Sequence, residues 1–140
     1  LTLIDVSIRA GKAGDIEGRI TQALQTLPPD DPMAGRLKVY QIGAQAGKGD
    51  VQKLTTQLKQ MIDQSKDTGL MALAYNTLGD CYNAAGLKKD AMWAYLWVDV
   101  VYNQDKAEQA KAVERLSRVF KELNDDQSAE LYKARLKSLR

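Results

Sequence analysis

The sequence contains no histidine, and this absence removes several kinds of chemistry at once. Histidine is the usual general base near neutral pH and a common zinc ligand. Without it, nucleophiles of the Ser-His or Cys-His kind are excluded, and a zinc site would depend on one cysteine and on carboxylates. We therefore expect no catalysis, no metal site and no cofactor.

Cysteine is nearly absent too, since Cys81 is the only one and no internal disulfide can form. At helical spacing Cys81 shares an apolar face with Ala74, Leu78 and Ala85. This placement favours a buried small side chain over a reactive thiol, which would need a basic neighbour.

Long apolar runs and a strong charge of one sign are also missing. The longest apolar run, Ala91 to Val98, is far shorter than the roughly 20 residues that span a bilayer, so we expect no transmembrane segment. A net charge of +2 is too small to imply nucleic-acid binding.

The chain opens at Leu1 without an initiator Met. We expect a piece or processed product of a longer precursor, and the compartment stays open between cytoplasm and bacterial envelope.

Proline is scarce and its positions are informative, because Pro28, Pro29 and Pro32 fall together. They predict a break between two helical segments, with Asp31 capping the helix that follows.

Glycine residues cluster between Gly43 and Gly49, a segment that includes a Gly-Lys pair. The spacing is one residue short of a phosphate-binding loop and no strand precedes it, so a turn is the better interpretation.

Helical periodicity is the main pattern present, and the stretch from Tyr75 to Tyr102 shows it best. Tyr75, Leu78 and Tyr82 share one helix face, Gly86 interrupts the pattern, and an apolar run follows. This predicts two helices joined by a short turn.

The same hairpin resembles a tetratricopeptide (TPR) repeat. The residues that carry the resemblance are Tyr75, Leu78, Gly79, Tyr82, Ala91, Tyr95 and Val98. Small residues at Gly79 and Ala91 would let two helix backbones approach closely. Asn103 stands where the family usually has a proline. The longer spacing of the repeats is similar to TPR variants of bacterial envelope assembly proteins.

Turn signals recur along the chain at Gly14, Gly49, Gly86 and Asn124, which brackets the roughly 34-residue TPR period. They predict hairpins at about 1–29, 32–66, 69–103 and 105–140, beginning with helices at 1–13 and 15–27. Asp105 with Glu108 resembles a capping box. We therefore expect one all-α domain over 1–140, a right-handed superhelical TPR-like solenoid.

The resemblance implies that the first helices of successive hairpins line a concave groove. The groove of the third hairpin would present Leu73, Asn76, Thr77, Asp80 and Asn83, and that of the fourth Lys111, Glu114, Arg115, Arg118 and Lys121. Our candidate partner-binding residues are Asn76, Asp80, Asn83, Lys111, Arg115 and Arg118. Two interpretations stay open, a solvated charged face or a groove for an acidic or extended peptide.

Lys111 and Arg115 match two residues of the carboxylate clamp of chaperone-binding TPR domains. Val39 and Gly43 stand where that clamp needs a lysine and an asparagine, which argues against a clamp of that type.

Trp93, Trp97 and Val101 form a second candidate surface, because they follow one another on a helix that is apolar on all sides. Either neighbouring hairpins cover them as ordinary core, or part of this face is open. An open face would bind another protein or a second copy of the chain.

The C-terminal segment is basic, with cations at Lys133, Arg135, Lys137 and Arg140. Cations suit the C-terminal end of a helix, and no aromatic residues are interleaved with them to favour nucleic-acid binding.

The overall functional prediction is a non-catalytic protein–protein interaction module that holds a peptide or protein segment. Self-assembly through the tryptophan helix is the alternative, and anion or RNA binding by Lys111, Arg115 and Arg118 is the outsider.

Overall fold

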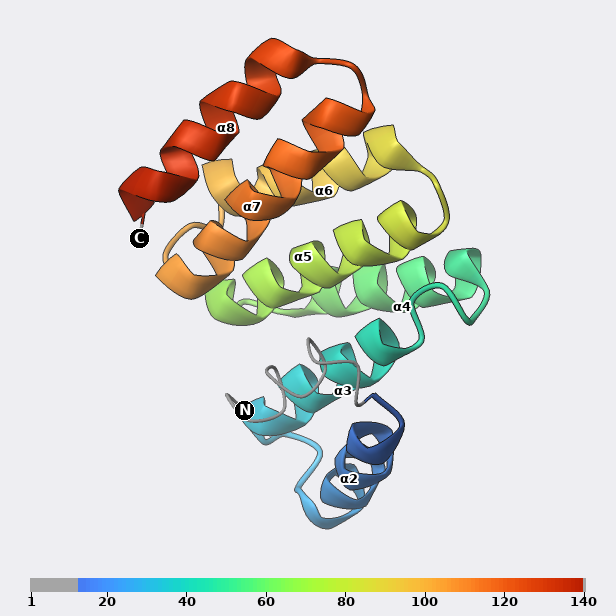
Figure 1. Cartoon of the computed structure of the whole chain (residues 1–140). Coiled ribbons are helices and arrows are strands. Elements are labelled where there is room, and N and C mark those ends of the chain that lie inside the picture. Colours follow the sequence, from blue (N-terminus) through green and yellow to red (C-terminus); the bar gives the residue numbers. More distant parts are fainter. Residues whose placement is uncertain (1–12, 140) are drawn as a thin grey trace.

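The computed structural model describes residues 13–139, and every regular element in that range is an α-helix (Figure 1). The all-α prediction is therefore confirmed, while the helix expected at 1–13 falls almost entirely outside the described residues. None of the described helices is both long and apolar enough to cross a bilayer. The helices are α2 (Ala13–Thr26), α3 (Pro32–Ala44), α4 (Val51–Gln64), α5 (Thr68–Ala84), α6 (Lys88–Val100), α7 (Lys106–Glu122) and α8 (Asp126–Leu139).

Aspartates begin most of these helices. A carboxylate accepts a hydrogen bond from a backbone N–H of the first turn, which satisfies a donor that has no partner within the helix. The predicted cap at Asp31 is confirmed, with a distance of 2.8 Å to Met33 N. The other capping aspartates are Asp50, Asp67, Asp105 and Asp125.

The capping box predicted at the start of α7 is only half present. Asp105 accepts from the backbone N–H of Glu108 at 3.2 Å. The side chain of Glu108 turns instead towards Asn76 and Lys111. A buried ion pair thus replaces the second half of the box.

The predicted turns at Gly86 and Asn124 are confirmed and have the same geometry. Both residues have positive φ, 80° and 64° respectively. After each, a backbone N–H reaches back five residues to a carbonyl, from Leu87 to Tyr82 and from Asp125 to Phe120, both at 2.9 Å. This is the Schellman ending of an α-helix. The two turns lie 38 residues apart, as the repeat predicts.

The helices follow one another across the molecule in chain order from α2 to α8 (Figure 1). Substantial contacts among the described helices join only those one or two places apart along the chain, such as α5 with α6 and α5 with α7. The arrangement is therefore not a closed bundle. Its handedness and superhelical form remain predictions.

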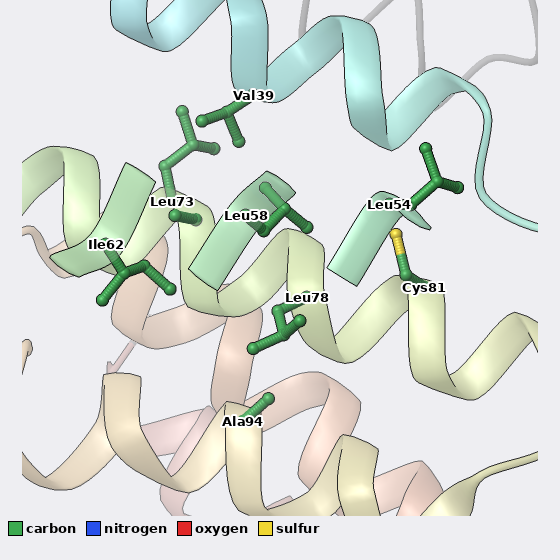
Figure 2. Packing of buried hydrophobic residues seen from close by; sticks show 9 residues of the cluster. Val39, Leu54, Leu58, Ile62, Leu73, Leu78, Cys81 and Ala94 are labelled. Atoms are coloured by element: carbon green, nitrogen blue, oxygen red, sulfur yellow. The ribbon is translucent and has the colours of Figure 1, made fainter. Parts of the chain in front are cut away.

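The core consists of successive clusters rather than one centre. Figure 2 shows the largest, where Val39 of α3, Leu58 of α4 and Leu78 of α5 converge. A second cluster, which includes Ala91, Tyr95, Leu116 and Val119, joins α6 to α7. Each helix pair thus buries its apolar face against the next pair.

Gly79 marks the closest approach between α5 and α6. A Cβ atom added there would lie 2.4 Å from Cε1 of Tyr95. The prediction that a small residue is needed at this crossing is confirmed.

The last helix buries little of its apolar surface. Ala129 is buried and Leu136 is half-buried, but Leu139 is exposed. The reason is that α8 packs mainly on α7, so only one side of the helix is covered extensively.

Candidate functional site

A groove of about 610 Å³ lies between α5 and α7, where the resemblance to TPR repeats places the binding surface. We call it the α5–α7 groove. Its lining residues are Asp80, Asn83, Tyr95, Ala107, Ala110, Lys111, Glu114, Arg115 and Arg118. Five of the six predicted groove residues are therefore brought together.

Asn76 is the exception, and the predictions for Leu73 and Thr77 were wrong in the same way. All three are buried. The cause is that α5 packs against four helices, α3, α4, α6 and α7. Of the positions predicted on α5, only Asp80 and Asn83 remain at the groove.

Asp80 and Arg115 form an ion pair across the groove. Arg115 donates from Nε to Oδ1 of Asp80 at 2.6 Å and from a terminal nitrogen to Oδ2 at 3.2 Å. The hydroxyl of Tyr95 donates to the same carboxylate at 2.6 Å. Because Asp80, Tyr95 and Arg115 come from α5, α6 and α7, this network ties three helices together.

The network keeps Tyr95 and Arg115 protonated near neutral pH. Burial and the Asp80 carboxylate both raise the pKa of Tyr95, so this phenol stays a hydrogen-bond donor. Burial alone would lower the pKa of Arg115, but the charge and hydrogen bonds of Asp80, together with the nearby Tyr95 and Glu114, outweigh burial and the net shift is upward. Neither group can act as an acid or base near neutral pH.

A second ion pair is buried beside the groove. Lys111 lies 3.0 Å from Oε2 of Glu108, and both side chains are less than one-tenth exposed. Asn76 donates to the carbonyl oxygen of Glu108 at 3.0 Å. Lys111 was predicted as an accessible groove cation, and this is wrong because it neutralises a buried carboxylate.

Arg118 is the most accessible of the predicted cations. Its side chain is 71% exposed, and it pairs with Glu114 at 2.5 Å on the adjacent turn of α7. Lys121, expected in the same row, lies 3.3 Å from Asp126. The carboxylates of this surface thus offset most of its positive charge.

Arg135 pairs with Asp99 in a second bridge between hairpins, which sequence reasoning missed. Asp99 is buried at the end of α6 and accepts two hydrogen bonds from Arg135 of α8. Burial alone would raise the pKa of Asp99, but hydrogen bonds from Arg135 and Gln109 outweigh it and hold it below its usual value. The interpretation of Arg135 as a cation at a helix end was therefore incomplete.

The tryptophan surface is open, so the interpretation of Trp93 and Trp97 as ordinary core was wrong. Trp93 is 61% exposed and Trp97 45%, and Val100 and Val101 are 67% and 41% exposed. With Leu96 they surround a shallow hollow of about 220 Å³. We call these five residues the α6 face.

Aromatic neighbours hold Trp97 in place. Its ring stacks on Tyr75 of α5 with centroids 5.7 Å apart, and Tyr75 in turn stacks on Tyr102 at 5.5 Å. The indole of Trp97 therefore lies against a stack of aromatic rings.

No family model matches the chain. No curated protein or solved structure is significantly similar to it either. The TPR resemblance thus rests on residues of this chain alone, and function has to be argued from its surfaces.

Cys81 and the carboxylates are the residues to examine for a nucleophile or a metal site. Burial raises the pKa of the Cys81 thiol to about 11, so it is protonated at neutral pH. Within residues 13–139, no three cysteine or carboxylate side chains lie close enough together to hold a metal ion.

Proposed function

We propose that this chain is a non-catalytic protein–protein interaction module and that the α6 face is its contact surface. The observation that carries the proposal is the exposure of two tryptophans and two valines side by side along α6 and at its C-terminal cap. Leaving such groups in water is unfavourable, and contiguous apolar patches on soluble proteins mark interaction sites.

The α6 face has the composition of an interface centre. Tryptophan is enriched among residues that dominate binding energy, and charged residues are depleted there. Trp97 is already held by Tyr75, so a partner would lose little free energy in ordering this side chain.

A TPR-like solenoid is the scaffold that we propose beneath this surface. Two Asp–Arg bridges support it, since Asp80 with Arg115 and Asp99 with Arg135 join residues 35 and 36 positions apart. The Gly86 and Asn124 turns repeat at a similar interval. Contacts between helices two places apart would propagate a repeat along the chain.

The α5–α7 groove is the second candidate binding surface, favoured by its volume and by the accessible Arg118. It would suit an extended segment with acidic side chains. We rank it second because Asp80 and Glu114 already pair with its arginines. A nucleic-acid ligand is less favoured again, for the same reason.

Peptide display distinguishes the two surfaces. A random peptide library would be selected on the wild type, on a Trp93→Gln/Val100→Gln variant and on Arg118→Gln. We expect sequences rich in apolar residues to be enriched on the wild type and on Arg118→Gln, but not on the double variant. Enrichment of acidic peptides that requires Arg118 would favour the groove. No enrichment that depends on either surface would contradict the proposal.

A further inference from the structure

We propose that a second copy of this chain covers the α6 face, with the two α6 helices packed antiparallel about a two-fold axis. The inference rests on the proposed function, because it names the partner of the same surface. A two-fold interface uses one patch twice, so the patch must be complementary to itself.

The spacing of the α6 face meets this requirement. Trp93, Leu96, Trp97 and Val100 occupy positions i, i+3, i+4 and i+7, a single stripe along the helix. The stripe is symmetric about the midpoint between Leu96 and Trp97. In an antiparallel pair, Trp93 would lie opposite Val100 of the second copy, and Leu96 opposite Trp97. Each tryptophan thus meets a smaller aliphatic side chain, as interlocking packing requires.

Charge along α6 favours this orientation. The run from Ala91 to Val98 carries no charge, and Asp99 is buried against Arg135, so the two paired stripes themselves contain no unpartnered ion. Lys89 is exposed at the start of the helix. An antiparallel pair keeps the two copies of Lys89 apart at opposite ends of the contact, whereas a parallel pair would place the two lysines together. Antiparallel helix dipoles also attract.

The size of the face predicts a weak dimer. An aromatic side chain can bury about 150–250 Å², so the exposed parts of the two tryptophans together offer roughly that area. Stable interfaces bury about 800 Å² on each partner. The dimer should therefore form at high protein concentration and dissociate on dilution.

Disulfide trapping tests the geometry. Trp93→Cys and Val100→Cys proteins would be mixed and gently oxidised, because a disulfide needs Cα atoms within about 7 Å. We expect the mixed 93–100 product to exceed the 93–93 and 100–100 products several-fold. Cys81 is buried and its thiol pKa is about 11, so it should not compete. Trp93→Cys mixed with Leu131→Cys is the control, since Leu131 is equally exposed on α8.

Sedimentation of the unmodified protein is the second measurement, over about 5–500 µM, the range in which a weak dimer changes population. We expect the average mass to rise with concentration. We expect Val100→Gln to weaken the dimer at least tenfold, while Leu131→Gln does not.

Predominant 93–93 and 100–100 disulfide products would overturn the antiparallel arrangement. A monomer throughout, with tryptophan-dependent peptide enrichment retained, would overturn the second copy as partner alone. A monomer without that enrichment would overturn the proposed function as well.

Discussion

At the scale of single residues, several side chains that were predicted to bind a partner hold the helices together instead. Asp80 and Arg115 pair across two hairpins, and Lys111 neutralises Glu108 in a buried site. A charged residue at helical spacing opposite an apolar stripe is therefore not always solvated. Its role depends on which helix packs against it.

Gly79 gives the most local prediction. Gly79→Ala would push a methyl group into the Tyr95 ring, where the closest atom lies 2.4 Å from the new Cβ. We expect a loss of about 1–3 kcal/mol in the free energy of unfolding, measured by urea denaturation. Gly18→Ala is the matched control, because nothing lies within 4 Å of a Cβ there. It should be neutral or stabilise α2 by up to about 1 kcal/mol. Equal effects at both glycines would contradict the close crossing.

Asp99 predicts how stability depends on pH. Its pKa is lower in the folded chain than in the unfolded one, so the unfolded state takes up the proton first. The stabilisation is present above the unfolded pKa of about 3.9 and is lost as pH falls through the lower folded value. Denaturation between about pH 5 and pH 2 should therefore show a smaller fall in the free energy of unfolding for Asp99→Asn than for wild type.

At neutral pH, the loss in the free energy of unfolding can be compared between Arg135→Met and Asp99→Asn. Arg135→Met removes the charged partner of the buried Asp99 carboxylate, which keeps a hydrogen bond from Gln109, and should cost about 3–5 kcal/mol. Asp99→Asn leaves Arg135 partly in solvent and should cost less, about 1–3 kcal/mol. The reverse order of the two losses would argue against a bridge that matters for folding.

At the scale of elements, the turns at Gly86 and Asn124 offer a test built into the chain. Both have positive φ, and nothing lies within 4 Å of a Cβ at Gly86. Gly86→Ala should therefore cost about 1–2 kcal/mol through backbone strain alone. Gly86→Asn should cost less, because asparagine holds the same conformation at the equivalent turn. Thermal unfolding of the two variants would measure this, and equal losses would mean that the two turns are not equivalent.

Helix ends were largely predictable because their signals are local. Aspartate caps, the proline cluster and left-handed Gly or Asn each act within one turn of the chain. The predicted starts near Asp31 and Asp105 and the turns at Gly86 and Asn124 were therefore placed correctly.

Exposure was harder to predict, because it depends on packing between helices. Asn76 was expected in the groove, but α7 lies across it and Glu108 accepts its hydrogen bond. Trp93 and Trp97 belong to a helix that is apolar on all sides, and the sequence does not show which side lacks a neighbour. A search for Asp–Arg pairs one repeat apart would have found both bridges between hairpins.

At the scale of the whole molecule, the described helices form a succession of pairs in which contacts extend to the next helix but one. Such an arrangement leaves one helix face of each pair outward. Those faces are mostly polar, whereas α6 presents tryptophan and valine. This difference is the physical basis of the proposed interaction surface.

Two-dimensional NMR at increasing protein concentration tests most directly whether two copies of the chain associate through the α6 face. The chain has two tryptophans, so the two indole N–H signals report on the α6 face without ambiguity. We predict that both signals, and the backbone amides of Leu96 and Val100, shift progressively on concentration while those of Asn83 and Arg118 stay fixed. Shifts confined to the α5–α7 groove, or a spectrum that does not change with concentration, would contradict the association of two copies through the α6 face.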